Sequence, residues 1–339
     1  ARHVNGSATG NVSLGSGTLM NAKEGASNAD VDYNIAIGQN ALQGGTLAAD
    51  NDLIGNIAIG YNAFKSTGTQ NHVGTIAIGY NALTAVTSGS DNVAVGYQAL
   101  MDMTTGDKNT AVGYEALLLD VVDGSQNVAI GSQAIGGTLG TTADNSSDLI
   151  AIGYQALGGN WGNTTLTDNI AIGTSAMGGA INGAINCIAI GRETLDGALT
   201  PGANGTVGIG YQALKYLTTG ASNIAIGFRS LYVHTTGARN IAIGELAMTD
   251  TNAGSTSLGS ADNVFIGYTA GGGTWTDAAS NQNIGIGTNV MNGALAGALN
   301  NVGIGNAALN SLTSADSNTA IGYLAGNDLT TGHSNVLLG

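Results

Sequence analysis

The chain has 339 residues and a formal net charge of −14, with 56 Gly and charged side chains at only 9% of positions. It has no basic stripe to neutralise phosphates, which argues against nucleic-acid binding, and an anionic membrane surface would repel it. The single Cys187 excludes an internal disulfide framework, and we expect a buried structural thiol.

A five-residue motif recurs along the whole chain, and Asn34, Ile35, Ala36, Ile37 and Gly38 are a representative copy. There are 18 copies at spacings of 17 to 23 residues, and we number each copy from its Gly as position 0. A fixed period of about 20 residues is typical of a solenoid, in which each repeat stacks on its neighbours. The copies end at Gly15, Gly38, Gly60, Gly79, Gly96, Gly113, Gly131, Gly153, Gly173, Gly191, Gly210, Gly227, Gly244, Gly267, Gly287, Gly305, Gly322 and Gly339.

Positions −3 and −1 are aliphatic in almost every copy, as in Ile35 and Ile37. Alternation at period two places both on one face of a short strand, and we expect that face to be the interior. Position −2, as in Ala36, is Ala in twelve copies, Gly in three and Ser in one. Such small residues predict that this second face is also buried, either against the far wall of the coil or against another chain.

After the motif Gly comes a second apolar pair, such as Ala82 and Leu83. We therefore expect a sharp bend at the Gly, a returning second strand and a closing turn. Position −4 is Asn in 14 copies, as in Asn34, which predicts a ladder of stacked amides. The predicted fold is an all-β parallel β-solenoid of about 18 two-strand coils, on the order of 85 Å long at about 4.8 Å per coil.

The motif covers nearly the whole length, which predicts one elongated domain over 1–339. Coil lengths also vary with a longer period of five or six coils, which predicts super-repeats at approximately 39–131, 132–244 and 245–339. Because the strand motif is constant, the extra residues of the longer coils must bulge. We expect protruding loops around 44–55, 136–148 and 250–262.

Aromatic residues are the candidate contact residues. Position +1 is Tyr in eight copies, and Tyr61, Tyr80, Tyr97 and Tyr114 occupy it in four consecutive ones. Such a row either covers the edge of the roll or offers a platform for a sugar or a protein. Trp161 and Trp275 are expected in bulges of other long coils and are further candidates for contact.

The motif Asn-x-Ala-Ile-Gly, followed by a small-residue turn, resembles the heads of trimeric autotransporter adhesins (YadA-like). The variant from Gly96 to Leu100, Gly-Tyr-Gln-Ala-Leu, is similar to repeats of phage tail fibres. The resemblance covers nearly the whole chain and implies a left-handed parallel β-roll. It also implies that three rolls pack into a homotrimer with the small-residue face near the axis.

No pattern in the sequence predicts catalysis. His3, His72, His234 and His333 are scattered without the spacing of a metal site or a triad, and no phosphate-binding loop is present. Asp residues precede several motifs, but the nonapeptide of calcium-binding β-rolls does not recur. We expect no enzyme activity, no cofactor and no metal.

The main hypothesis is a structural fibre, extracellular, on a cell surface or on a virion, that projects or adheres. One alternative is an adhesin head that binds matrix or glycan. Another is a subunit of a head-to-tail filament, because the array starts and stops without polar caps. An ice-binding solenoid is a further alternative. It would need a flat, regular array of Thr, whereas the Thr residues of this chain occupy turns of variable length. The expected partner is thus the chain itself, with a host-surface glycan or protein in addition, and no membrane insertion is expected.

Overall fold

The computed structural model describes most of the chain. The described residues are 9–21, 30–45, 47, 51–118, 123–137, 145–162, 164–251, 259–276 and 278–339. By its internal contacts the chain divides into two compact units, 1–169 and 170–339, and each is considered by itself. Both units are β-solenoids built from parallel strands, as the sequence predicted.

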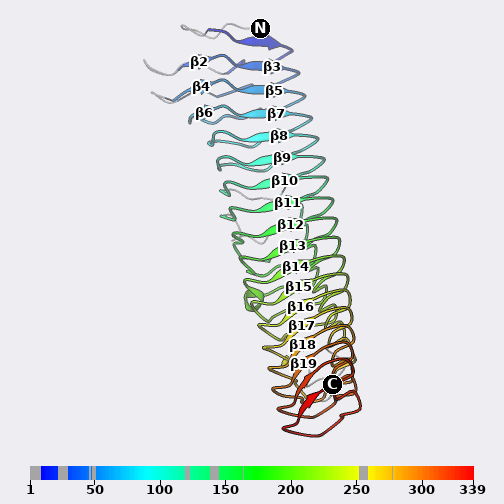
Figure 1. Ribbon diagram of the computed structural model, residues 1–339. Coiled ribbons are helices and arrows are strands. Elements are labelled where there is room, and N and C mark those ends of the chain that lie inside the picture. The colour runs from blue at the N-terminus through cyan, green and yellow to red at the C-terminus, as the bar shows by residue number, and fades with distance from the viewer. Residues whose placement is uncertain are drawn as a thin grey trace. The chain divides into compact units, whose positions relative to one another are not determined.

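Unit 1 stacks one three-residue strand per coil, and the strands lie parallel above one another (Figure 1). The strands are β1 (Val12–Leu14), β3 (Ile35–Ile37), β5 (Ile57–Ile59), β7 (Ile76–Ile78), β8 (Val93–Val95), β9 (Thr110–Val112), β10 (Val128–Ile130) and β11 (Ile150–Ile152). Three coils carry an additional two-residue strand, and these pair in a small parallel sheet of β2 (Val31–Asp32), β4 (Leu53–Ile54) and β6 (His72–Val73).

Unit 2 repeats the same arrangement. Its strands are β12 (Ile170–Ile172), β13 (Ile188–Ile190), β14 (Val207–Ile209), β15 (Ile224–Ile226), β16 (Ile241–Ile243), β17 (Val264–Ile266), β18 (Ile284–Ile286), β19 (Val302–Ile304), β20 (Thr319–Ile321) and β21 (Val336–Leu338). One 3-10 turn, η1 (Pro201–Ala203), begins at Pro201, and the Thr200 hydroxyl accepts a hydrogen bond from the Gly202 amide at 3.3 Å. Proline suits this position because its missing N–H is not needed there.

The register of the strands is constant although the coils differ in length. Ile35 pairs with Ile57, 22 residues later, and Ile76 pairs with Val93, 17 residues later, each in the same motif position. The additional residues of longer coils therefore lie outside the main strands, as predicted. The central parts of the three expected loops (46 and 48–50, 138–144 and 252–258) lie outside the described residues.

The interior of each coil is formed by the small-residue face of the strands. All twelve Ala at position −2 are fully buried, whereas the residues at −3 and −1 are half-buried or exposed. The prediction that the aliphatic pair faces the interior is therefore wrong. Ala36 and its equivalents were expected to face either the far wall of the coil or another chain. They face the far wall of their own coil, so this column does not line a contact between chains.

The far wall explains why position −2 must be small. A β-carbon built on Gly208 would lie 2.7 Å from Cγ2 of Thr194, and one built on Gly303 would lie 2.9 Å from Cγ2 of Val290. Real β-carbons essentially never approach other atoms below 3.0 Å. The two walls are thus so close that the coil interior accepts large side chains from only one of them.

Phe265 is the large exception in this column, and its neighbours make room for it. Its ring is fully buried and meets the Trp275 ring edge to face, with 5.8 Å between the centroids. Gly285, which pairs with Phe265 on the next strand, and Gly271 would each place a β-carbon under 3.0 Å from the ring. The missing side chains of Gly271 and Gly285 therefore leave the space that the Phe265 ring occupies.

The segment after the motif Gly fills the interior but is not a strand. Leu83 and its equivalents are buried, yet the segment forms consecutive turns rather than the second strand that the sequence predicted. The residues at +2 and +4 take left-handed backbone angles, such as φ 54° at Asn81 and 51° at Leu83. Gly79 bends at φ 142°, and a β-carbon there would lie 2.1 Å from the Gly96 carbonyl oxygen in the next coil. Only glycine fits this bend.

The Asn ladder at position −4 is present as predicted. In unit 2 the side-chain amide of each Asn from Asn240 onward donates to Oδ1 of the ladder Asn in the preceding coil, at 2.8–3.1 Å. The same Oδ1 also accepts from the backbone N–H of the donating Asn, as Asn223 does from Asn240. The second amide hydrogen reaches a turn carbonyl, as from Asn283 to Ala298 at 2.8 Å. The ladder consists of Asn223, Asn240, Asn263, Asn283, Asn301, Asn318 and Asn335. It satisfies buried polar groups that stacking would otherwise leave unpaired.

Candidate interaction face

The side chains at positions −3 and −1 of the main strands form a solvent-facing surface in each unit, which we call the outer aliphatic face. Many of its residues are well exposed, including Ile130 at 39%, Ile286 at 39% and Ile321 at 43%. Every described residue in these positions is Ile, Val, Leu or Thr, so the face carries no charge. A continuous apolar surface of this kind on a folded chain usually marks a site of association.

A row of stacked tyrosines runs beside this face in unit 1, at position +1. The rings of Tyr61, Tyr80, Tyr97 and Tyr114 are 5.1–5.3 Å apart between centroids, nearly parallel, and 41–49% exposed. Tyr211 and Phe228 stack in the same way in unit 2, at 5.4 Å. The stacking follows from the coil repeat, which brings equivalent side chains one strand spacing apart. The four tyrosines are therefore accessible for contact, and a contact role for them stays a prediction.

A second row of polar side chains lies at position +2, and the sequence analysis did not single it out. Asn40 donates to Asn62 at 3.1 Å, and Asn62 donates to Asn81 at 3.2 Å. Asn tolerates the left-handed backbone angle of this position better than most residues do. The signal was available, because Asn or Gln recurs two residues after many of the motif glycines.

The two tryptophans are core residues, which corrects the expectation that they protrude for contact. Trp161 and Trp275 are both fully buried. The Trp275 indole N–H donates to the Gly271 carbonyl at 3.0 Å, and its ring packs against Phe265. The longer coils thus enclose a large side chain instead of presenting it to solvent.

Trp275→Ala should lower the free energy of unfolding by about 3–5 kcal/mol, because it empties a large buried site that the thin coil cannot refill. Tyr268→Ala, in the same coil but 50% exposed, is the matched control and should cost less than about 1 kcal/mol. Denaturant unfolding of both variants measures the difference. Equal losses would show that Trp275 is not a core residue.

Two histidines are buried inside the coils. His234 lies 2.8 Å from the Thr251 hydroxyl and 2.9 Å from the Gly237 carbonyl oxygen, and burial lowers its pKa to about 4. Burial also lowers the pKa of His72, whose ring nitrogens contact the Gly89 and Thr67 carbonyls. Both therefore serve as neutral polar fillers of the interior near pH 7.

Stability should fall on acidification before most carboxylates titrate. The unfolded His234 binds a proton near its ordinary pKa of 6.5, whereas the folded one does so only near 4. Its stability contribution is complete above pH 6.5 and is lost as the pH falls toward 4, by up to about 3 kcal/mol. Unfolding midpoints at pH 7 and 4.5 should differ less in His234→Gln than in the original chain. An equal pH dependence in both would contradict the buried neutral imidazole.

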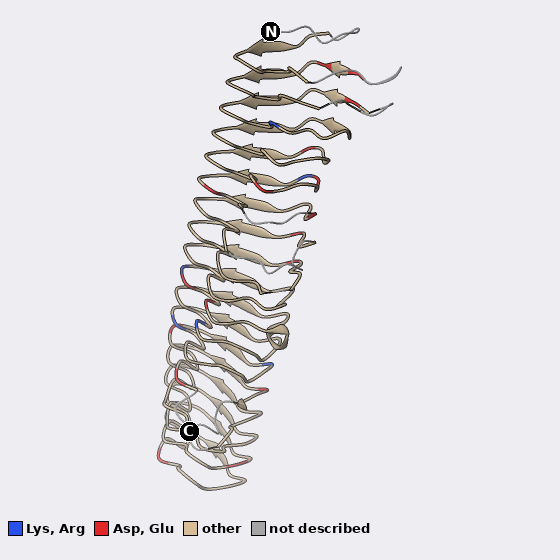
Figure 2. Cartoon of the chain, turned by 180° about the vertical axis from the view of Figure 1, so that it is seen from behind, with Lys and Arg blue, Asp and Glu red and all other residues tan. Residues whose placement is uncertain are grey.

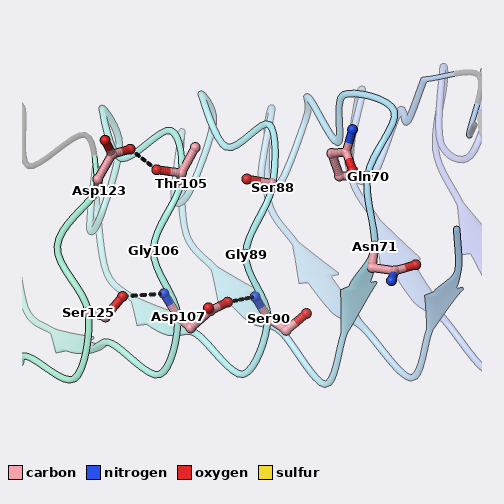
Figure 3. Close-up of a pocket in the computed structure, with 10 residues that line it drawn as sticks. All are labelled: Gln70, Asn71, Ser88, Gly89, Ser90, Thr105, Gly106, Asp107, Asp123 and Ser125. Atoms are coloured by element: carbon pink, nitrogen blue, oxygen red, sulfur yellow. Dashed lines mark hydrogen bonds between the residues drawn. The ribbon is translucent and has the colours of Figure 1, made fainter.

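A shallow polar recess of about 450 Å³ lies along the turn edge of unit 1 (Figure 3). The Ser90 amide donates to Asp107 Oδ1 at 2.7 Å, the Asp107 amide donates to Ser125 Oγ at 3.0 Å, and the Thr105 hydroxyl bonds the Asp123 carboxylate. These three hydrogen bonds each join one turn to the next.

Cys187 takes the Asn position of its motif and is fully buried, as expected, with Sγ 3.4 Å from the Ala203 carbonyl oxygen. Burial raises the pKa of its thiol, which disfavours the reactive thiolate. Within the described ranges, no three His, Cys, Asp or Glu side chains gather closely enough to hold a metal ion.

Comparison with known proteins gives no family. No protein-family model matches the chain, and no curated protein resembles it significantly. In the described part of the chain, none of the helical structure has the length and apolar character that crossing a membrane requires.

Proposed function

We propose that the chain is the repeating shaft of a structural fibre, extracellular, on a cell surface or on a virion, and that it works as a homotrimer. The outer aliphatic face is the observation that carries this proposal. A solvent-exposed, uncharged sheet surface that recurs in coil after coil is costly for an isolated chain, and association removes it from water.

A threefold arrangement suits two parallel columns of side chains. When three such faces meet around an axis, the column at −3 of each chain packs against the column at −1 of the next. Such a contact is heterologous and closes on itself after three chains. This replaces the arrangement that the family resemblance implied, because the small-residue column is inside the coil and the aliphatic columns would line the axis.

The aqueous surface of the assembly would then consist of the turns and the tyrosine row. Projection and holding are the proposed work of the chain.

Electron microscopy of the purified protein, together with its mass in solution, tests the proposal. Short rods with three times the 33.4 kDa chain mass are expected. Single chains at micromolar concentration would contradict it. Long filaments of indefinite mass would favour the head-to-tail filament instead.

A further inference from the structure

Unit 2 gathers positive charge and aromatic rings on three consecutive coils. Four of the eight Lys and Arg residues of the chain lie on these coils, and three of the four lie among the aromatic rings. Figure 2 shows basic segments close together along one edge. We call this group the Arg229 cluster, and it consists of Arg192, Tyr211, Lys215, Phe228, Arg229 and Tyr232. In a chain of net charge −14 such a group stands out from the surrounding surface.

Aromatic rings frame the guanidinium of Arg229. Its central carbon lies 4.9 Å from the ring centroid of Tyr232, 5.3 Å from that of Phe228 and 6.0 Å from that of Tyr211. Cations attract the faces of such rings at these distances. Phe228 is still 42% exposed and stacks on Tyr211, so the two rings offer a flat apolar surface beside the charge.

The neighbouring cations Arg192 and Lys215 both pair with a carboxylate, but Arg229 does not. Glu193 accepts from Lys215 Nζ at 2.6 Å and from Arg192 Nε at 3.1 Å, and these contacts, with a hydrogen bond from Gln212, lower the pKa of Glu193 to about 2. Arg229 donates through Nε to Gln212 Oε1 at 2.8 Å. Across the described residues, no carboxylate pairs with Arg229 and no protein group accepts from its two terminal nitrogens.

The Arg229 side chain is therefore fixed in place while its terminal N–H groups remain available. Two parallel N–H groups match the two oxygens of a carboxylate. An adjacent aromatic face matches the apolar face of a sugar ring. We propose that the Arg229 cluster binds an acidic polysaccharide, with a hexuronate carboxylate on Arg229 and its sugar ring over Phe228 and Tyr211. This binding activity goes beyond the proposed shaft function.

Titration calorimetry of the full chain with oligogalacturonate tests the site, and the methyl-esterified oligomer is the matched neutral ligand. Oligogalacturonate should bind, weaken as salt is raised, and lose at least tenfold in affinity on esterification. Sulfated dextran of equal length should bind less tightly, because a sulfate ester holds its charge one atom further from the sugar ring than a hexuronate carboxylate does. Equal binding of the acid and the ester, or tighter binding of sulfated dextran, would overturn the proposal.

Arg229→Gln should reduce the affinity at least tenfold, and Arg229→Lys should recover only part of it because Lys keeps the charge without the paired donors. Arg239→Gln is the control, since Arg239 pairs with Asp262 at 2.6 Å, outside the cluster. Melting curves show whether each variant is folded. Unchanged binding by folded Arg229→Gln would overturn the site. A change in solution mass instead would identify the cluster as a contact between copies, which also overturns it.

Discussion

Ala225→Leu is expected to destabilise unit 2 by about 3 kcal/mol or more, because the added atoms point into a coil interior that has no space for them. Ala225 is fully buried and pairs with Gly208, where even a single added carbon would lie 2.7 Å from the Thr194 side chain. The bulk cannot move outward, since the strand is held in register on both sides.

Ile226→Leu is the matched control on the adjacent residue of β15. It keeps the volume on the outer face and should cost less than about 1.5 kcal/mol. Denaturant unfolding followed by circular dichroism measures both variants. A tolerated Ala225→Leu would mean that the small residues do not face the far wall of the coil.

The second large effect concerns assembly. The double variant Ile226→Lys with Ile243→Glu should convert the proposed trimer to single chains of 33.4 kDa at micromolar concentration. The two positions pair directly on β15 and β16, so the new charges attract each other in the isolated chain. In the assembled state the same charges would be buried in an apolar contact, which is strongly unfavourable.

Glu245→Lys changes charge on an exposed residue just beyond β16 and should leave the mass unchanged. Sedimentation measures all three proteins. If the double variant is folded and retains the original mass, the outer aliphatic face is not the contact between chains.

The sequence predicted what the repeat itself encodes. The parallel strands, their register, the Gly bend and the Asn ladder all follow from residues that recur at fixed positions. Gly38 and Asn34 are examples, since the bend takes Gly in every copy and the ladder uses the side-chain amide of Asn. These features needed no knowledge of distant contacts.

The orientation of the strands was predicted wrongly because alternation defines two faces without stating which is inside. Ile35 and Ile37 are the bulkier pair, and bulk alone favours the interior. The structure reverses this because Leu at position +4 already fills the coil and leaves space for Ala36 only. Comparing the two walls of one coil, rather than one strand, would have given the correct answer.

The tryptophans and the Arg229 cluster show two further limits of prediction from the sequence. Trp275 belongs to a longer coil. The sequence analysis expected the extra residues of such coils to protrude, whereas in this coil they enclose the large Trp275 ring. Arg192, Tyr211 and Arg229 are 19 and 18 residues apart in sequence and become neighbours only through the coil repeat. Aligning the copies by their Gly would have placed them side by side.

An electron cryo-microscopy reconstruction of the assembled protein at side-chain resolution tests the central claim most directly. The account predicts that the Ala column lies inside each coil and that the Ile and Val columns are covered by another copy of the chain. Density with the Ala column at the contact between chains, or with the aliphatic columns open to solvent, would contradict it.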